Sequence, residues 1–341
     1  MSDTIIKADR GFLPRAEALR GLAALSVLAF HATSLVFDLV TTGLAPVVVF
    51  FVLSGFVLSK SLDRGPIIST FLRHRAFRLL PAAIVTVGLM TFLYWQFGFY
   101  TGFLPSFDPL NVVLNALLVR SDINGPMWSL TVEVAAIPVI LLCHRAFQTA
   151  GYLPLAVLAF ILFGLSFWGP YVHLLGGVTN LAPLYSFVFG VMAYFYRSAQ
   201  QPNAVSGRAA QIIEAAALLL IFVAGCRKQT GYTILAETIS ASALLVVVAS
   251  TNHPTLLGKL LDTTAIRFLG RISYSFYLLH MIGLSVALRT LPAMPDLPYA
   301  LALFLFGAIV TIPMAWLMWR WVEVPFIELG KSRQFQRYKS A

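Results

Sequence analysis

The stretch Arg20-Gly-Leu-Ala-Ala-Leu-Ser-Val-Leu-Ala-Phe-His31 carries two ionisable side chains on a segment that is otherwise suited to lipid. A helix rises about 1.5 Å per residue, so an Arg20 at the membrane edge puts His31 roughly 16 Å deeper, near the bilayer midplane. An ionisable side chain at that depth is costly to insert and therefore needs a reason. His31 either pins two helices together through a hydrogen bond or has a function.

Apolar segments of this kind recur along the whole chain. Hydrophobic residues make up 59% of the 341 positions and charged residues only 11%, unlike a soluble domain. Runs of about 20 apolar residues are long enough to cross the hydrocarbon core. Ten such spans are predicted: 19–37, 44–60, 79–98, 128–147, 152–168, 180–197, 210–226, 232–250, 268–290 and 298–321. The predicted fold is therefore all-α, a polytopic transmembrane helical bundle that forms a single domain over residues 1–341.

The basic residues predict how the spans are oriented. If residues 1–18 are cytoplasmic, the inside segments hold twenty of the 24 Lys and Arg residues and the outside segments hold four. This is the asymmetry of the positive-inside rule, so the tail 322–341 is predicted to be cytoplasmic too. The same asymmetry, together with anionic membrane lipid, accounts for the net charge of +10. Because the basic residues are spread over separate segments, nucleic acid is not expected as a partner.

Polar residues also recur inside other predicted spans. Ser54 interrupts an apolar run, where a small residue often serves only to let two membrane helices approach closely. Glu133 lies at lipid depth, where a carboxylate must pair, protonate or face a polar cavity. His280 lies past the midpoint of its span, and Tyr274 and Tyr277 precede it three positions apart on one helical face. These residues are candidates for an intramembrane site or for buried structural contacts.

Two arginines are predicted in the cytoplasmic loop before the third span. Arg75 and Arg78 are three positions apart at the mouth of the span and would share a helical face. Guanidinium groups suit phosphate because they bind it bidentately. Anchoring by the positive-inside rule explains such residues equally well, and from composition alone it is the simpler interpretation. No glycine-rich phosphate loop occurs in the sequence.

Six motifs together resemble the membrane acyltransferase-3 family. They are the Arg20–His31 spacing, Phe50–Phe56, Arg75 and Arg78 with Pro81, Trp128-Ser129 with Glu133, Ile272–His280 and Glu323-Val324-Pro325. The resemblance covers essentially the whole chain and is to the membrane-only form of the family. It implies a multi-pass enzyme of the bacterial cell inner membrane. Such an enzyme moves an acyl group, most often acetyl, from cytosolic acyl-CoA to a hydroxyl of a glycan or glycolipid acceptor.

The resemblance also implies roles for individual residues. His31 is the general base or a transient acyl carrier, because imidazole is matched to proton transfer near neutral pH. Arg20 either orients the CoA end or holds the entry, and Glu133 either fixes the His tautomer or accepts a sugar hydroxyl. Acetyl-CoA is the expected donor, and no metal is expected. The residues expected to bind the donor or to line the substrate path are Arg75, Arg78 and Arg271 for the donor, and Ser54, Tyr274 and His280 for the path.

The predicted orientation also implies a two-sided reaction. Donor and acceptor should enter from opposite faces, with Arg75 on the cytoplasmic side and Glu133 toward the outside. A cavity at mid-depth, walled by His31, Ser54, Glu133 and His280, should connect them.

Two other classes of protein compete with this interpretation. A proton-coupled transporter of a small polar or glycan substrate also uses intramembrane His and Glu residues. The sequence has no paired halves with matching broken spans, which would be the best pointer to a carrier. An unrelated, eukaryotic-type membrane acyltransferase family would place its key His elsewhere, with an Asn or Asp partner. The motif in the first span argues against that family.

Overall fold

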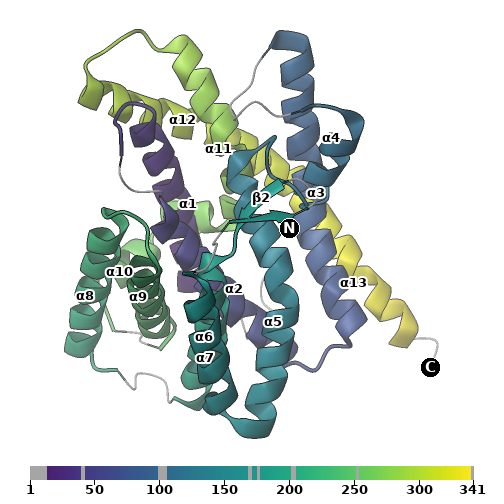
Figure 1. Ribbon diagram of the computed structural model, residues 1–341, viewed down its shortest axis with the longest axis vertical. Coiled ribbons are helices and arrows are strands. Elements are labelled where there is room, and N and C mark those ends of the chain that lie inside the picture. Colours follow the sequence, from purple (N-terminus) through teal and green to yellow (C-terminus); the bar gives the residue numbers. More distant parts are fainter. Residues whose placement is uncertain are drawn as a thin grey trace.

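Long helices make up most of the protein (Figure 1). The computed structural model describes residues 14–39, 43–98, 106–167, 171–174, 177–200, 205–250 and 253–338. Within these ranges the predicted helical class is confirmed, with one exception. The strands β1 (Tyr171–Leu174) and β2 (Gly177–Asn180) form an antiparallel hairpin just before the predicted sixth span.

Each of the ten predicted spans overlaps a helix. The corresponding helices are α1 (Pro14–Ser34), α2 (Leu44–Leu62), α3 (Ile68–Phe97), α5 (Trp128–Ala150), α6 (Tyr152–Leu165), α7 (Tyr185–Ala199), α8 (Gly207–Gly225), α9 (Gly231–Ser250), α11 (Thr264–Thr290) and α12 (Asp296–Met318). The remaining helical elements are short or terminal: α4 (Pro109–Ala116), α10 (Leu256–Leu261), the 3₁₀ turns η2 (Gly125–Met127) and η3 (Ala182–Leu184), the π-turn η4 (Trp319–Glu323) and α13 (Val324–Tyr338).

Seven helical stretches in the described part of the chain are long and apolar enough to cross a membrane. The other three helices that overlap predicted spans differ in a specific way. The helices α6 and α7 have 14 and 15 residues, which at about 1.5 Å per residue fall short of the hydrocarbon thickness. The first turns of α1 carry Arg15, Glu17 and Arg20. Ten crossings and two cytoplasmic termini therefore stay predictions.

Two boundaries differ from those predicted. The helix α3 begins at Ile68, eleven residues before the predicted span, so Arg75 and Arg78 lie inside a helix and not in a loop. The helix α12 continues through η4 into α13, so the described part of the predicted tail is helical. In both places charged residues lower the hydropathy without stopping the helix, because Arg, Lys and Glu are good helix formers.

Glycines bring the helices that carry the candidate residues close together. A Cβ on Gly21 of α1 would stand 2.5 Å from the backbone nitrogen of Gly270 on α11. A Cβ on Gly55 of α2 would overlap the carbonyl oxygen of Phe187 on α7. Backbones that approach this closely are typical of membrane helix packing at small residues. The close-approach interpretation of the stretch around Ser54 therefore holds for its neighbour, Gly55.

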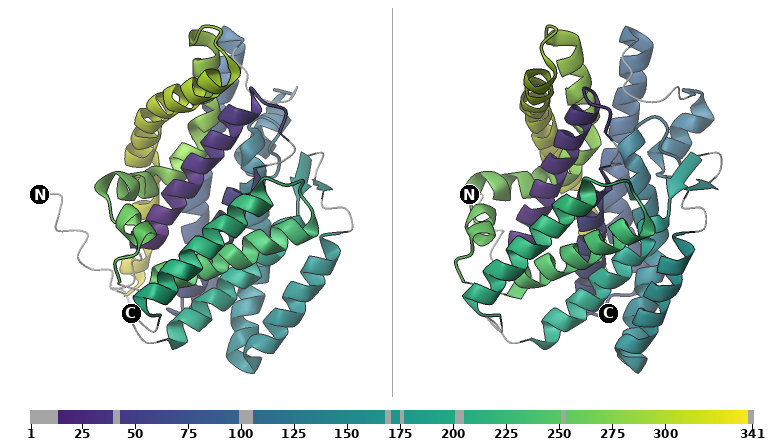
Figure 2. Two further views of the ribbon diagram at one scale, coloured as in Figure 1. Left: turned by 90° about the vertical axis from the view of Figure 1, so that its left-hand side faces the viewer. Right: turned by 60° about the vertical axis from the view of Figure 1, so that its left-hand side comes forward.

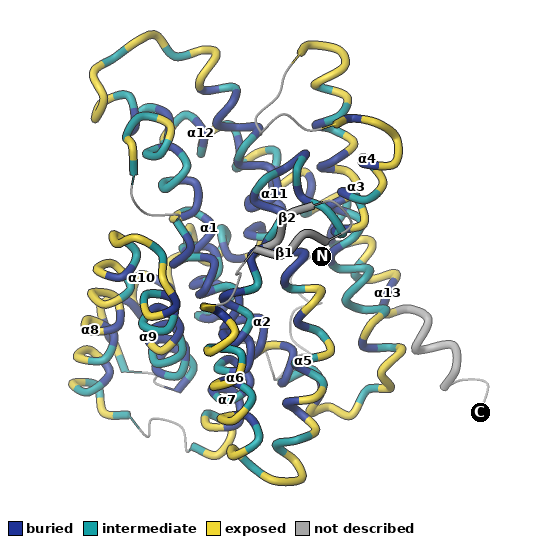
Figure 3. Tube along the Cα trace, viewed as in Figure 1, coloured by how far each residue is buried: buried dark blue, intermediate teal, exposed yellow. Residues whose placement is uncertain are grey.

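Buried positions concentrate along α1, α2 and α11, in the middle of the molecule (Figure 3). The helices α8 and α9 pack side by side (Figure 2), both contact α2, and α9 also contacts α1. Large apolar side chains such as Phe160, Phe222 and Ile309 are exposed on α6, α8 and α12. Exposed apolar faces on peripheral helices are those of a bundle in contact with lipid. Of the polar candidates, His31, Ser54 and His280 lie on the central helices α1, α2 and α11.

Candidate active site

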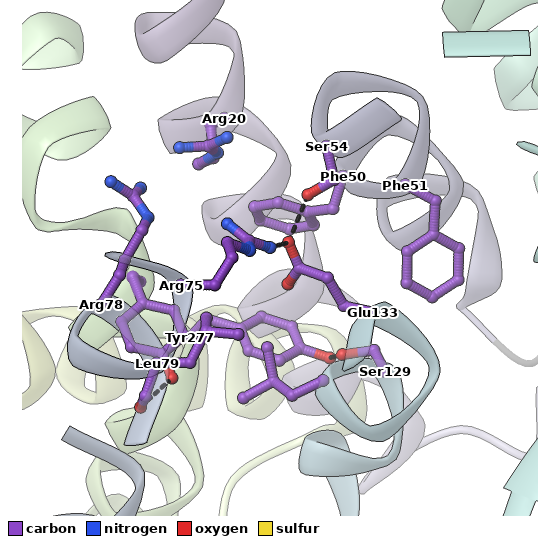
Figure 4. A pocket seen from close by; sticks show the side chains of 12 residues that line it. Arg20, Phe50, Phe51, Ser54, Arg75, Arg78, Leu79, Ser129, Glu133 and Tyr277 are labelled. Atoms are coloured by element: carbon purple, nitrogen blue, oxygen red, sulfur yellow. Dashed lines mark hydrogen bonds and ion pairs between the residues drawn. The ribbon is translucent and has the colours of Figure 1, made fainter. Parts of the chain in front are cut away.

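A buried ion pair and a hydrogen bond connect the helices α2, α3 and α5. Glu133 of α5 accepts hydrogen bonds from Ser54 of α2 and from Arg75 of α3 (Figure 4). The side chains of Arg75 and Glu133 are only 11% and 15% exposed. A charge this far from water is tolerated when a partner of opposite charge and further hydrogen bonds compensate it. Glu133 is therefore paired with a cation, and it also faces a polar cavity.

Two adjoining cavities surround this ion pair. The first, of about 50 Å³, is lined by Arg20, Phe50, Phe51, Ser54, Arg75, Arg78, Leu79, Ser129, Leu130, Glu133, Tyr274 and Tyr277. The second, of about 150 Å³, is lined by Arg20, Ser54, Val57, Leu58, Ser61, Phe71, His74, Arg75 and Arg78. We call the two together the arginine cavity, since Arg20, Arg75 and Arg78 line both.

The arginine cavity carries an excess of positive groups. Three of the residues that line its first part have a guanidinium group, and one, Glu133, has a carboxylate. Among the residues that the structure describes, the buried Nε atom of Arg75 and the buried Nε2 atom of His74, a donor when it carries the proton, have no hydrogen-bond partner. Buried donors without partners are rare and costly in proteins. A bound anion with several oxygen acceptors would satisfy these donors and offset the charge.

His31 lies in a different and larger cavity. This outer cavity, as we call it, has about 570 Å³ and is lined by Val27, Phe30, His31, Ser34, Leu35, Gly43, Leu44, Val47, Gly125, Pro126, Trp128, Tyr277 and Met281. The ring of His31 stacks on that of His280, with 5.3 Å between centroids and 29° between planes. The two histidines, 249 positions apart in the sequence, are thus brought together by α1 and α11.

His280 is fully buried and held in one orientation. Its Nδ1 lies 2.6 Å from the carbonyl oxygen of Tyr277. A carbonyl only accepts, so in the neutral imidazole this contact assigns the proton to Nδ1. The Nε2 atom is buried and has no hydrogen-bond partner within the described ranges of the chain. In the described part of the chain, no group of three or more His, Cys, Asp or Glu residues is placed to hold a metal ion.

The two tyrosines of α11 are fixed by hydrogen bonds. Tyr274 lines the arginine cavity and donates its hydroxyl to the carbonyl of Leu79, at 2.7 Å. The hydroxyl of Tyr277 donates to the carbonyl of Pro126 at 2.8 Å and lies 2.8 Å from the hydroxyl of Ser129. Tyr277 lines both the arginine cavity and the outer cavity.

The structure changes the arrangement expected of these residues in two ways. Ser54 and Glu133 line the arginine cavity, while His31 lines the outer cavity, so the expected cavity common to these residues is divided. The expected separation of Glu133 from Arg75 toward opposite faces is wrong, because the two are in contact. At lipid depth, direct pairing with a cation stabilises a carboxylate more than a shift toward the outer face.

Arg271 was expected to bind the donor, but it is not among the residues that line these cavities. Its side chain is exposed, with the guanidinium carbon 5.8 Å from the ring centre of Phe268.

A buried carboxylate next to the arginine cavity received no role from the sequence. Glu323 ends the π-turn η4, is 3% exposed, and accepts hydrogen bonds from the backbone and the hydroxyl of Ser275. It lies within electrostatic range of Arg78 and Arg20. Single π-turns are often found at functional sites. The sequence pointed to this position only through the motif Glu323-Val324-Pro325. Hydropathy does not predict the π-turn in which Glu323 lies.

These features define an integral membrane protein with a buried, positively charged site beside a histidine pair. The family model described as an acyltransferase domain matches residues 14–320, and the chain belongs to this family, acyltransferase family 3. This confirms the resemblance drawn from the six motifs. The chain is also similar to an O-acetyl transferase of Shigella phage Sf6, with 27% identity over 138 residues. That match covers 34% of this chain and 41% of the relative, less than half of each. No solved structure matches the chain.

Proposed function

We propose that the protein is an O-acyltransferase of the bacterial inner membrane, with ten crossings and both termini in the cytoplasm. It would move an acyl group, acetyl in the first instance, from cytosolic acyl-CoA to a hydroxyl of a cell-surface or exported glycan. The observation that carries the proposal is that a cavity rich in arginine adjoins a cavity that contains a histidine. The family and the phage O-acetyl transferase support the reaction class.

The arginine cavity would bind the donor. Arg20, Arg75 and Arg78 would hold the phosphates of CoA, because guanidinium forks match phosphate oxygens bidentately. Glu133 would act as a positioning residue here: it fixes Arg75 and Ser54 through its hydrogen bonds. A role in setting the tautomer of His31 finds no support, since the two line different cavities. Arg271, on the exposed side of α11, would meet the donor only as it arrives.

The outer cavity would be the place of transfer. As a general base, His31 would take the proton of the acceptor hydroxyl while the oxygen of that hydroxyl attacks the thioester carbonyl carbon. The carbon–sulfur bond then breaks, and the thiol of CoA leaves with a proton. As an acyl carrier, His31 would instead hold the acyl group before the acceptor attacks. In either case His280, stacked on His31, would hold its ring in place. Ser54 and Tyr274 would line the path of the donor.

The test uses purified protein in lipid with acetyl-CoA and a glycan acceptor. His31→Ala should lower the rate of transfer by roughly 10²–10⁴, the contribution of a general base. His144→Ala is the matched control, because His144 is a buried histidine of α5 that lines neither cavity. Wild-type turnover in the His31 variant would refute its role. Intact acetyl-CoA together with proton-coupled uptake into vesicles would favour the transporter.

A further inference from the structure

Tyr277 occupies a special position between the two cavities. Among the described residues that line the outer cavity, Tyr277 is the one that also lines the arginine cavity. It is 5% exposed and is a buried part of both linings. The three arginines line the arginine cavity, and His31 lines the outer cavity. A direct route for an acyl group from a donor held by the arginines to a site beside His31 therefore runs past Tyr277, the residue common to both linings.

Three other elements hold the side chain of Tyr277. Its hydroxyl is bound to the carbonyl of Pro126, in η2, and to the hydroxyl of Ser129, at the start of α5. Its ring meets that of Phe50, on α2, edge to face at 5.5 Å. Its own carbonyl accepts from Nδ1 of His280. A movement of the ring thus breaks two hydrogen bonds and changes the contact with the ring of His280, whose centroid lies 5.6 Å from that of Tyr277.

We propose that Tyr277 determines whether an acceptor hydroxyl or water receives the acyl group. The ring of Tyr277 separates the thioester from water in the outer cavity. An acceptor that occupies the outer cavity displaces the ring. This inference rests on the proposed function and identifies the residue that makes transfer specific. Closed sites protect reactive groups from water in the same way.

The side reaction that Tyr277 would suppress is hydrolysis of the donor. The oxygen of a water molecule attacks the thioester carbonyl carbon, and the carbon–sulfur bond breaks. The acid and the free thiol of CoA are released, with the two protons of water divided between them. Transfer to the acceptor breaks the same carbon–sulfur bond, so both reactions consume the donor equally. The ratio of hydrolysis to transfer therefore measures the specificity, whatever the overall rate.

The first experiment measures this ratio in Tyr277→Phe and Tyr277→Ala. We expect Tyr277→Ala to raise hydrolysis relative to transfer by at least about tenfold, because removal of the ring joins the cavities. Tyr277→Phe, which loses only the hydroxyl contacts, should give a smaller rise. The controls are Tyr185→Phe and Tyr185→Ala: Tyr185 is a fully buried tyrosine that lines neither cavity. A tyrosine with a merely structural role would lower both rates together, as in the controls, and this result would overturn the proposal.

The second experiment needs no acyl-CoA. In a background with both native cysteines replaced, Ser34→Cys reports on the outer cavity, and Ser69→Cys, at the exposed start of α3, reports on the opposite side. An anionic, membrane-impermeant methanethiosulfonate is added from the side where position 69 reacts. Position 34 should be protected when Tyr277 is present and should react in Tyr277→Ala. Equal labelling in both backgrounds would overturn the barrier, whereas a wild type that never consumes acyl-CoA but shows the expected labelling would refute only the proposed function.

Discussion

The ion pair between Arg75 and Glu133 makes a quantitative prediction about stability. Arg75→Ala leaves Glu133 in a buried position with Ser54 as its remaining hydrogen-bond partner. Removal of one partner of a buried pair costs about 3–5 kcal/mol, because the other charge stays buried. Arg20, which remains within electrostatic range of Glu133, offsets part of that charge. With an unfolding entropy of about 2.1 cal/mol/K per residue over 341 residues, this cost lowers the Tm by about 4–7 °C. Helices that persist in detergent unfold with less entropy, so the shift in this protein should be at least that large.

A double-mutant cycle separates the pair from the surrounding packing. In the variant with both Arg75→Ala and Glu133→Ala, neither member of the pair stays buried without the other. Its loss of stability should be smaller than the sum of the two single losses by about 1–3 kcal/mol. The assay is thermal unfolding of the four purified proteins in one detergent. The pair of Arg15 and Asp262 is the matched control, since its side chains are 18% and 36% exposed; its coupling should be only about 0–1 kcal/mol.

If the losses of unfolding free energy caused by Arg75→Ala and Glu133→Ala add to within about 0.5 kcal/mol, the two side chains are not coupled and the prediction is wrong. Additivity would mean that the charges are solvated in the functional state and that the cavity around them is filled with water.

Two further predictions concern charges at and near the arginine cavity. Arg78→Ala should weaken the binding of acetyl-CoA, measured by equilibrium dialysis, and should make this binding less dependent on salt. Unchanged binding together with reduced membrane insertion would mean that Arg78 serves only as an anchor. Hydrogen bonds from Arg15, and a further one from Arg267, lower the pKa of Asp262 to about 2. Because the folded protein favours the charged form, this stabilisation is complete above the usual pKa of 3.8 and is lost as the pH falls toward 2. The drop in Tm over that range should be smaller in Asp262→Asn, and an identical drop would contradict the assignment.

Hydropathy was enough to predict the helical class and the approximate place of each helix. It failed where charged residues continue a helix, as at Arg75 and Arg78, since a window of hydropathy registers their charge and not their helix propensity. It also failed to distinguish the short helices α6 and α7 from full spans. Apolar composition extends over neighbouring residues that the structure assigns to loops or to the β1–β2 hairpin.

The site was predictable as a set of residue types but not as an arrangement. That Glu133 must pair, protonate or face a polar cavity follows from its depth, whereas its pairing with Arg75, 58 positions earlier, is a tertiary contact. The stacking of His31 on His280 has the same origin. The division into two cavities depends on the orientation of one side chain, Tyr277, which its hydrogen bonds to Pro126 and Ser129 set. No sequence pattern encodes such an orientation.

The two cavities differ in the type of interaction by which they can bind a ligand. In the arginine cavity, Glu133 is the one carboxylate among the described residues of the first lining, and Glu323 and Glu17 lie within electrostatic range of Arg20 and Arg78. The guanidinium groups of the lining favour a polyanion, and salt screens that attraction. The outer cavity is lined mainly by apolar side chains, with His31, Ser34, Trp128 and Tyr277 supplying its polar atoms, so a ligand there binds through shape and burial of apolar surface. A donor selected by charge and an acceptor selected by shape can then occupy neighbouring cavities without competing, and the separation by Tyr277 keeps the two selections independent.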